Sequence, residues 1–169
     1  MATLSLRAGL LAFVLLGVAG PALSCGIETP ALSCKWTNTE PPINLVHIES
    51  GEINRRGEAV GYHHRPNGLD PPGARVLRIA QPPNGNGIYR ARVALRDSAT
   101  YTWVQKKAAS TFFPDAMSPQ EVVEAILMAF HHGQAGGGGQ FIGPSGAGFA
   151  IEGWYQKGRI NAPYPLRGP

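Results

Sequence analysis

The segment from Ser118 to Gly133 constrains the fold most, because it carries the clearest helical signal in the chain. Ser118 is a favoured N-cap residue, Pro119 suits the first helical position, and Glu121 completes a capping box. The apolar residues that follow recur at helical spacing and predict one buried stripe, formed by Val122, Val123, Ile126, Leu127, Ala129 and Phe130. Gly133 ends the pattern. We therefore expect one amphipathic helix that buries this stripe in the core.

Strand-like runs lie on both sides of this helix and are separated by turn residues. Residues 75–79 form the first run, and residues 88–95 follow the turn sequence Asn84-Gly85-Asn86-Gly87. Alternation in the second run puts Tyr89, Ala91, Val93 and Leu95 on one face and Ile88, Arg90 and Arg92 on the other. After the helix, residues 149–155 and 159–164 are expected to form a hairpin with its turn at Lys157-Gly158. A helix among antiparallel strands predicts an α+β fold: one domain with antiparallel sheets and few helices.

The first 24 residues have the features of a secretory signal peptide. Arg7 supplies a positive charge, residues 10–18 are apolar but too short for a membrane span, and small residues precede Cys25. A lipoprotein signal is the alternative, in which Cys25 is acylated, although Ala22 fits such a signal poorly. Either reading predicts that the mature protein is secreted or periplasmic and has no membrane span.

Residues 25–42 form an N-terminal segment that holds the two cysteines of the chain, close together, and then becomes polar. Cys25 and Cys34 could close a small disulfide loop in an exported protein, and two unpaired thiols are the alternative. Neither arrangement indicates catalysis or zinc binding, because the spacing matches neither a Cys-X-X-Cys motif nor a zinc site.

The charge of the chain permits an anionic ligand but does not demand one, since 15 Lys and Arg exceed 11 Asp and Glu by only four. The positions of the positive charges along the chain are more informative than the net charge. Arginines that could hold phosphates gather in the middle third, at Arg55, Arg56, Arg65, Arg75, Arg78, Arg90, Arg92 and Arg96. For any one of them, an ordinary solvated strand face is the alternative. The glycine-rich run at 134–140 lacks the Lys-Ser/Thr of a phosphate-binding P-loop, so a nucleotide site is not indicated.

Two histidines, His47 and His63, flank a basic loop that is punctuated by glycines. They could face one substrate as base and acid, because imidazole performs both tasks near neutral pH. A metal site that adds His64 to this pair is not supported, since the stretch has no His-X-His or His-X-X-X-His pair with a companion carboxylate. We therefore predict no metal ligands.

Three blocks of the chain together resemble the bacterial branch of the EndoU endoribonuclease family. They are His47-Ile48 with Gly51-Glu52-Ile53-Asn54-Arg55-Arg56-Gly57 and Gly61-Tyr62-His63; Ser110-Thr111-Phe112-Phe113-Pro114-Asp115 with Ser118-Pro119-Gln120-Glu121-Val122; and Trp154 with Gly158-Arg159-Ile160 and Tyr164-Pro165. The blocks follow the family's order and spacing over about residues 43–166. The resemblance implies an EndoU-like nuclease domain at residues 43–169.

The resemblance also implies a reaction. Such an enzyme cleaves single-stranded RNA by attack of a ribose 2′-hydroxyl on the adjacent phosphodiester, which leaves a 2′,3′-cyclic phosphate and a 5′-hydroxyl. The family's two histidines fall on His47 and His63, and His64 has no counterpart. No cofactor is implied as required, and dependence on a divalent metal such as manganese stays open. Many bacterial relatives are toxins paired with immunity proteins, so an immunity protein is a further expected partner.

Other site residues follow from the same resemblance. The family stabilises the charge on phosphorus with a lysine, for which Lys106 and Lys107 are both candidates. Ser110 or Thr111 could hydrogen-bond a base edge or phosphate, or could equally end a strand. Tyr164 matches an aromatic residue that packs on the sugar or base. Among the arginines near the histidines, Arg65 is the candidate for binding substrate.

The chain departs from the family pattern at Ala162, where related enzymes usually carry Thr two residues before the tyrosine. The missing hydroxyl puts uridine preference in doubt and favours weakened activity. A protein on the same scaffold that binds RNA or anions without turnover is therefore the alternative to an active ribonuclease.

Overall fold

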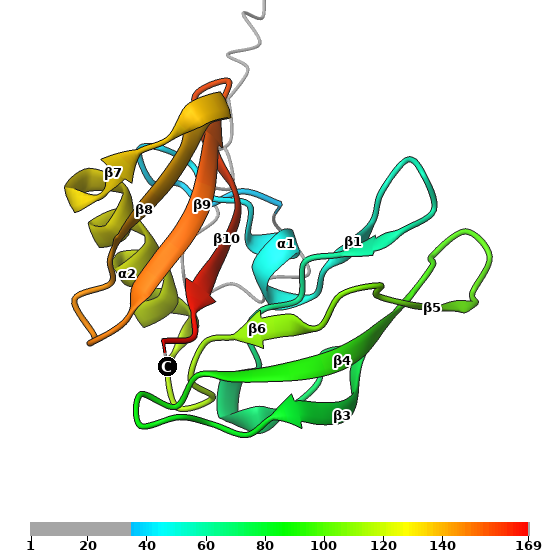
Figure 1. Cartoon of the computed structure of the whole chain (residues 1–169). Helices are drawn as coiled ribbons and strands as arrows, with labels where there is room; N and C mark the ends of the chain where they lie inside the picture. Colours follow the sequence, from blue (N-terminus) through cyan, green and yellow to red (C-terminus); the bar gives the residue numbers. More distant parts are fainter. Residues whose placement is uncertain (1–34, 169) are drawn as a thin grey trace, which may run out of the picture.

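The computed structural model describes residues 35–168 and confirms the predicted α+β fold, a single small domain with antiparallel sheets and few helices. The expected signal peptide and both cysteines lie outside the described residues. Two four-stranded sheets form two halves of the domain, and a short helix with a small hairpin lies beside them (Figure 1). In the described part of the chain, no helix is long and apolar enough to cross a membrane.

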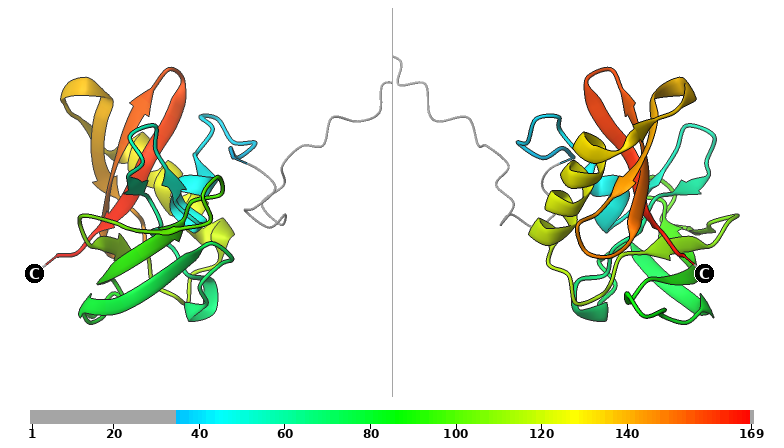
Figure 2. Two further views of the ribbon diagram at one scale, coloured as in Figure 1. Left: turned by 90° about the vertical axis from the view of Figure 1, so that its right-hand side faces the viewer. Right: turned by 60° about the vertical axis from the view of Figure 1, so that its left-hand side comes forward.

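One half combines the long helix with the C-terminal sheet. Helix α2 (Pro119–His132) covers a sheet in which β7 (Gln134–Ala135), β8 (Gln140–Pro144), β9 (Ala150–Gln156) and β10 (Arg159–Leu166) are ordered β10-β9-β8-β7 (Figure 2). A 3-10 turn, η3 (Gly137–Gly139), joins β7 to β8. The core between them is aliphatic and aromatic, with Val122, Ile126, Phe141, Ile151 and Ile160 all buried. Burial of this face supplies most of the stability of such a half.

The other half is the sheet formed by β3 (Ala74–Gln81), β4 (Tyr89–Arg96), β5 (Trp103–Gln105) and β6 (Ser110–Phe112). Strand β4 is central, with β3 on one side and β5 and β6 on the other. Its second core contains stacked aromatic rings, since Tyr89 and Phe112 lie parallel at 4.9 Å and Tyr62 meets Phe112 edge-on at 5.1 Å. A 3-10 turn, η2 (Pro66–Gly68), precedes this sheet.

A short helix, α1 (Leu45–Glu49), and the hairpin of β1 (Glu52–Ile53) and β2 (Ala59–Val60) complete the domain. Periodicity did not predict α1, because five residues are too few to show a helical repeat. Its N-cap is Asn44, whose side chain accepts a hydrogen bond from the backbone N–H of His47 at 3.2 Å. The helix also contacts β10, so it joins the hairpin to the C-terminal sheet.

The sequence signals for the long elements are confirmed. Ser118 caps α2 with the predicted capping box, and the run at 88–95 is β4 shifted by one residue. The face of β4 predicted to be apolar is the buried one, while Arg90 and Arg92 lie on the opposite, half-buried face. That second face of β4 is the one turned toward the site described below.

Replacement of Ser118 by Ala should lower the free energy of unfolding by about 1 kcal/mol, because it removes the acceptor for the N–H of Glu121 at the start of α2. Urea unfolding followed by circular dichroism measures this loss. Ser118→Asp, which restores an acceptor, is the matched control and should stay close to wild type. Equal stability of the Ala and Asp variants would contradict the capping role.

Candidate active site

A cavity of about 360 Å³ lies where β10 approaches β6 and contains most of the predicted site residues. Its polar lining consists of His47, His63, Arg90, Lys106, Thr111 and Tyr164. The remaining wall is small or apolar and consists of Val60, Gly61, Ala108, Ala109 and Ala162. None of these residues is acidic, so the His47–His63 cavity has the electrostatic character of an anion site.

The two histidines are brought together by a turn at Gly61 and Tyr62. Both residues have left-handed backbone angles, with φ of 78° and 62°, and a Cβ on Gly61 would lie 2.3 Å from the carbonyl oxygen of His47. Only glycine fits this approach. The N–H of Tyr62 then donates to His47 O at 2.7 Å, and the N–H of His63 donates to Ile48 O at 2.7 Å. The rings of His47 and His63 consequently stack with centroids 5.5 Å apart.

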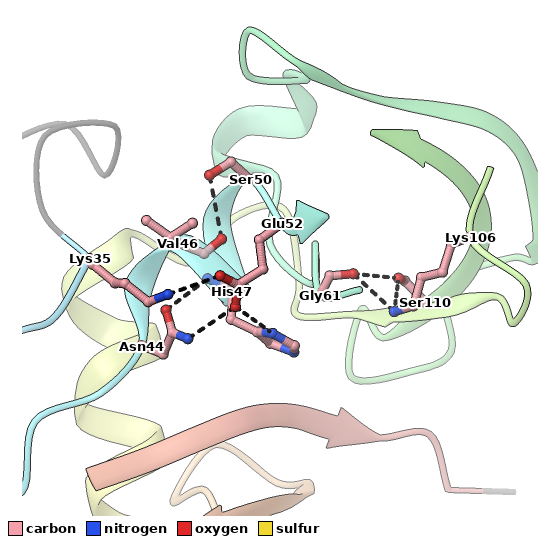
Figure 3. A network of polar contacts seen from close by, with 9 residues as sticks. All are labelled: Lys35, Asn44, Val46, His47, Ser50, Glu52, Gly61, Lys106 and Ser110. Carbon is pink, nitrogen blue, oxygen red and sulfur yellow. Dashed lines mark hydrogen bonds and ion pairs between the residues drawn. The ribbon is translucent and has the colours of Figure 1, made fainter. Parts of the chain in front are cut away.

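His47 lies beside a carboxylate that is held in place on several sides (Figure 3). The Nδ1 of His47 is 3.7 Å from Oε1 of Glu52, a distance for an ion pair rather than a hydrogen bond. Asn44 donates to the same oxygen at 3.3 Å and Lys35 donates to Oε2 at 3.0 Å. The contacts with His47 and Lys35 outweigh burial and lower the pKa of Glu52 to about 2. Glu52 is therefore an ionised carboxylate fixed beside the His47 ring.

His63 is held by a backbone carbonyl rather than by a carboxylate. Its Nδ1 is 2.8 Å from the carbonyl oxygen of Thr111, which only accepts, so Nδ1 carries the proton and Nε2 has a free lone pair. Burial lowers the pKa of His63 well below its usual 6.5, and the charges of Lys106 and His47 lower it further. At neutral pH His63 is therefore a neutral base with its acceptor nitrogen in the cavity.

The structure separates the two candidate lysines. Lys106 lines the cavity, where its Nζ donates to Gly61 O at 2.9 Å and to Ser110 Oγ at 2.8 Å, as Figure 3 shows. Burial lowers its pKa to about 8, so it is still largely charged at neutral pH. Lys107 points to solvent, with 83% of its side chain exposed and Nζ 2.5 Å from Glu58. Of the two, only Lys106 can reach a ligand beside the histidines.

Of the two predicted hydroxyl residues, likewise, only one lines the cavity. Thr111 lines the cavity, whereas Ser110 is fully buried and uses its hydroxyl to donate to Gly61 O at 3.1 Å and to accept from Lys106. Ser110 is therefore placed to orient Lys106, and Thr111 is placed to meet a ligand. Their alternation along β6 explains the difference, because neighbouring side chains point to opposite faces of a strand.

Tyr164 and Ala162 both lie at the cavity wall formed by β10. The Tyr164 ring stacks on His63 with centroids 5.5 Å apart, and its hydroxyl donates to Glu152. The pairing of β9 with β10 shifts register between Asn161 and Tyr164, and this bulge turns Ala162 inward with φ at 47°. A β-branched residue such as Thr would be strained at that backbone angle.

Arg65 is placed outside the cavity. Its Nε donates to Asp70 Oδ1 at 2.7 Å, one terminal nitrogen donates to Gly68 O at 2.6 Å, and the other lies 3.8 Å from Asp115. The guanidinium of Arg65 is fully engaged by these contacts, which hold the loop before β3 in place.

Among the predicted site residues, the structure brings together His47, His63, Lys106, Thr111 and Tyr164. It leaves Arg65, Lys107 and the Ser110 side chain out of the cavity lining.

His64 is buried outside the cavity lining and has a structural role. It is completely buried, with Nε2 2.9 Å from Met117 O and Nδ1 2.9 Å from Oε1 of Glu49. Because the carbonyl of Met117 only accepts, Nε2 donates there, and one proton is held between His64 and Glu49. Glu49 ends α1, so this contact ties α1 to the loop that carries His63.

Sequence reasoning missed two neighbours of the histidines. Glu52 was part of the quoted motif, but nothing in the spacing showed that its carboxylate would lie beside His47. Arg90 was predicted on the face of β4 opposite to the core, and that alternation was the available signal for its position at the cavity.

Within residues 35–168, no group of three or more His, Cys, Asp or Glu side chains could hold a metal ion.

A second, larger cavity of about 560 Å³ lies on the other side of Glu52, between the β1–β2 hairpin and the end of β4. It is lined by Arg96 and Asp97 among others and contains none of the predicted site residues. The smaller cavity is therefore the candidate active site, because it brings together His47, His63 and Lys106.

The chain is similar in sequence to known proteins. Residues 44–167 match the family model described as bacterial EndoU nuclease. A protein described as a toxin from Bacillus cereus is 33% identical over 125 residues, which are 73% of this chain. The chain spans only 22% of the length of that toxin. No solved structure matches the chain.

Replacement of His64 by Ala should destabilise the domain by about 3–5 kcal/mol, because it leaves Glu49 buried without its partner. Chemical unfolding of purified protein measures the loss. His132→Ala, at the exposed end of α2, is the matched control and should unfold like wild type. Unchanged stability of His64→Ala would show that the buried pair does not hold α1 to the His63 loop.

His63 should titrate well below pH 6.5 and should carry its proton on Nδ1, as imidazole NMR can show directly. Its pKa is lower in the folded than in the unfolded chain, so its contribution to stability is present above pH 6.5 and is lost as the pH falls below that value. Lys106→Gln should raise the midpoint, because a neighbouring positive charge is removed, and Lys107→Gln should not. A wild-type midpoint at or above 6.5 would refute the neutral-base assignment.

Proposed function

The chain belongs to the bacterial EndoU nuclease family, and on that premise we propose that it is an endoribonuclease that cleaves single-stranded RNA by transphosphorylation. The observation that carries the proposal is the unequal environment of the two histidines in one cavity. His63 donates from Nδ1 to a carbonyl and is kept neutral, whereas His47 lies beside an ionised carboxylate. A neutral imidazole and an imidazole beside a carboxylate thus face the same space, an arrangement suited to one base and one acid.

His63 is proposed as the general base. Its Nε2 takes the proton of a ribose 2′-hydroxyl, and the 2′-oxygen forms a bond to the adjacent phosphorus. The Nδ1 hydrogen bond to Thr111 fixes both the tautomer and the orientation of the ring. The stacked ring of Tyr164 holds the other side of the imidazole and forms a wall against which a sugar or base can pack.

His47 is proposed as the general acid. The bond from phosphorus to the 5′-oxygen breaks, and His47 gives its proton to that oxygen, so the products are a 2′,3′-cyclic phosphate and a 5′-hydroxyl. Glu52 stabilises the charged imidazole before transfer and is itself held by Lys35 and Asn44. The proton gained by His63 and the proton lost by His47 balance over the step.

Lys106 is proposed to stabilise the negative charge that grows on the phosphoryl oxygens. Two of its three N–H donors are used by Gly61 O and Ser110 Oγ, which leaves one for the substrate. Fixed donors in a site of low polarity act strongly on a developing charge. Because side chains supply every proton and charge in this scheme, we propose that no metal is required; assays with chelator and with added manganese test this point.

A biological role as an exported toxin is proposed on two grounds. The related Bacillus cereus protein is described as a toxin, and residues 1–24 have the features of a signal peptide. Secretion or periplasmic location, and a partner immunity protein that protects the producing cell, follow from this proposal. Growth inhibition on expression, relieved by a neighbouring small gene, would support it.

The alternative is a protein that binds RNA or anions without turnover, favoured by Ala162 in the cavity wall. The strained backbone angle at this position weakens that argument, because it disfavours the threonine that would supply a hydroxyl. RNA binding without any cleavage by the purified protein would establish the alternative.

His47→Ala and His63→Ala should each lower kcat/KM on single-stranded RNA by about 10²-fold or more, the usual effect of losing an acid or base. Lys106→Gln should cause a loss of about 10²-fold, because it removes a charge beside the phosphate. Lys107→Gln is the matched control and should stay near wild type, since this lysine points to solvent. A loss in Lys107→Gln as large as that in Lys106→Gln would contradict the assignment.

The products distinguish the mechanism from other nucleases. RNA should end in cyclic phosphate and 5′-hydroxyl groups, and DNA of the same sequence should resist, because it lacks the attacking 2′-hydroxyl. Equal cleavage of DNA, or products that carry 5′-phosphates, would rule out transphosphorylation.

A further inference from the structure

Two arginines of the described chain, one of them in the lining of the His47–His63 cavity, have buried donors without acceptors. The Nε atoms of Arg90 and Arg167 are both buried and have no hydrogen-bond partner among residues 35–168. Arg90 lines the cavity itself, and Arg167 follows β10, with one terminal nitrogen 3.3 Å from Pro82 O. A buried guanidinium N–H is costly without an acceptor, so these two groups are suited to an anionic ligand.

Other arginines of the same sheet interact with groups of the protein itself. Arg92, two residues along β4 on the same face, donates to Lys107 O at 2.7 Å. Arg75 lies over the Trp103 ring at 4.0 Å. The arginines of this sheet are therefore usually held by the protein, which sets Arg90 apart.

Arg90 and Arg167 lie near the same end of the β3–β4 hairpin. In the β3–β4 ladder Gln81 pairs with Arg90, and the carbonyl of the next residue, Pro82, accepts the hydrogen bond from Arg167. On its other side Arg90 pairs with Thr111, whose carbonyl holds His63. In Figure 1 the C-terminal end of β10 lies near this hairpin end. The order in space is thus His63, Thr111, Arg90 and then Arg167.

We propose that Arg90 and Arg167 bind the phosphodiester next to the one that is cleaved. The strand would run from the histidines past Arg90 toward the end of the β3–β4 hairpin, with each guanidinium donating to phosphate oxygens. Lys106 and the histidines already serve the cleaved phosphate, and Arg167 lies beyond the cavity lining. The substrate class is therefore single-stranded RNA longer than a dinucleotide. This inference rests on the proposed function and deepens it.

Kinetics on substrates of two lengths test the proposal with purified protein. The dinucleotide cut fastest among UpA, CpA, ApA and GpA is compared with the same step inside a longer single strand. Arg90→Gln and Arg167→Gln should each raise KM for the longer strand by about tenfold, the effect of losing a hydrogen bond to a charged group. Arg167→Gln, outside the cavity lining, should leave the dinucleotide almost unchanged, and Arg90→Gln should affect the longer strand more than the dinucleotide. Arg92→Gln, on the same face of β4, is the matched control and should behave like wild type on both.

Salt dependence gives a second readout that does not require cleavage. Binding of a fully 2′-O-methylated strand, followed by fluorescence anisotropy, should weaken with salt, and the slope of log K against log salt should fall by about 0.7 for each phosphate contact removed. Equal losses on the dinucleotide and the longer strand would assign these arginines to the cleaved phosphate and overturn the proposal. Unchanged cleavage of both the dinucleotide and the longer strand by the two variants would also overturn the proposal. If wild type cleaves no RNA, the proposed function fails, and the binding slopes still decide the role of both arginines.

Discussion

The contact between α1 and the turn at residues 61–64 is the interaction on which the site depends. The carbonyls of His47 and Ile48 accept hydrogen bonds from the N–H groups of Tyr62, His63 and His64, and Gly61 permits the close approach because a Cβ would collide with His47 O. Buried backbone groups need such partners, so this arrangement is fixed rather than incidental. The contact between His64 and Glu49 also holds α1 to the turn at residues 61–64. Two histidines far apart in sequence are stacked as a result.

The structure then places two chemically identical side chains in different surroundings. Burial, a carbonyl and a nearby lysine keep His63 neutral, while the ionised carboxylate of Glu52 lies beside His47. The difference depends on charges contributed by distant segments, with Glu52 from the β1–β2 hairpin and Lys106 from the segment before β6. A cavity lined by cations and without carboxylates suits a phosphodiester, and ionised Glu52 lies just outside its lining. The proposed proton transfer and charge stabilisation would therefore depend on one arrangement of side chains.

Both sheets of the fold contribute to the cavity. The cavity lies where the two sheets meet, so β10 supplies Tyr164 and Ala162 while β4 and β6 supply Arg90 and Thr111. The bulge in β10 turns Ala162 inward at a backbone angle that small residues tolerate best. The proposed path of the substrate follows the half-buried face of β4, which alternation places opposite to the aromatic core.

The sequence by itself determined the elements whose signals are local. The capping box at Ser118, the stripe of α2 and the alternation of β4 depend on neighbours within a few residues, and the motif around His47 and His63 identified the pair. Only the tertiary structure decided between Lys106 and Lys107, placed Glu52 and Arg90 beside the site, and moved Arg65 into a separate network. Adjacent lysines look alike in a sequence, yet one extends into a cavity and the other into water. That difference is set by the packing of strands far apart in the chain, because burial and charge act through space rather than along it.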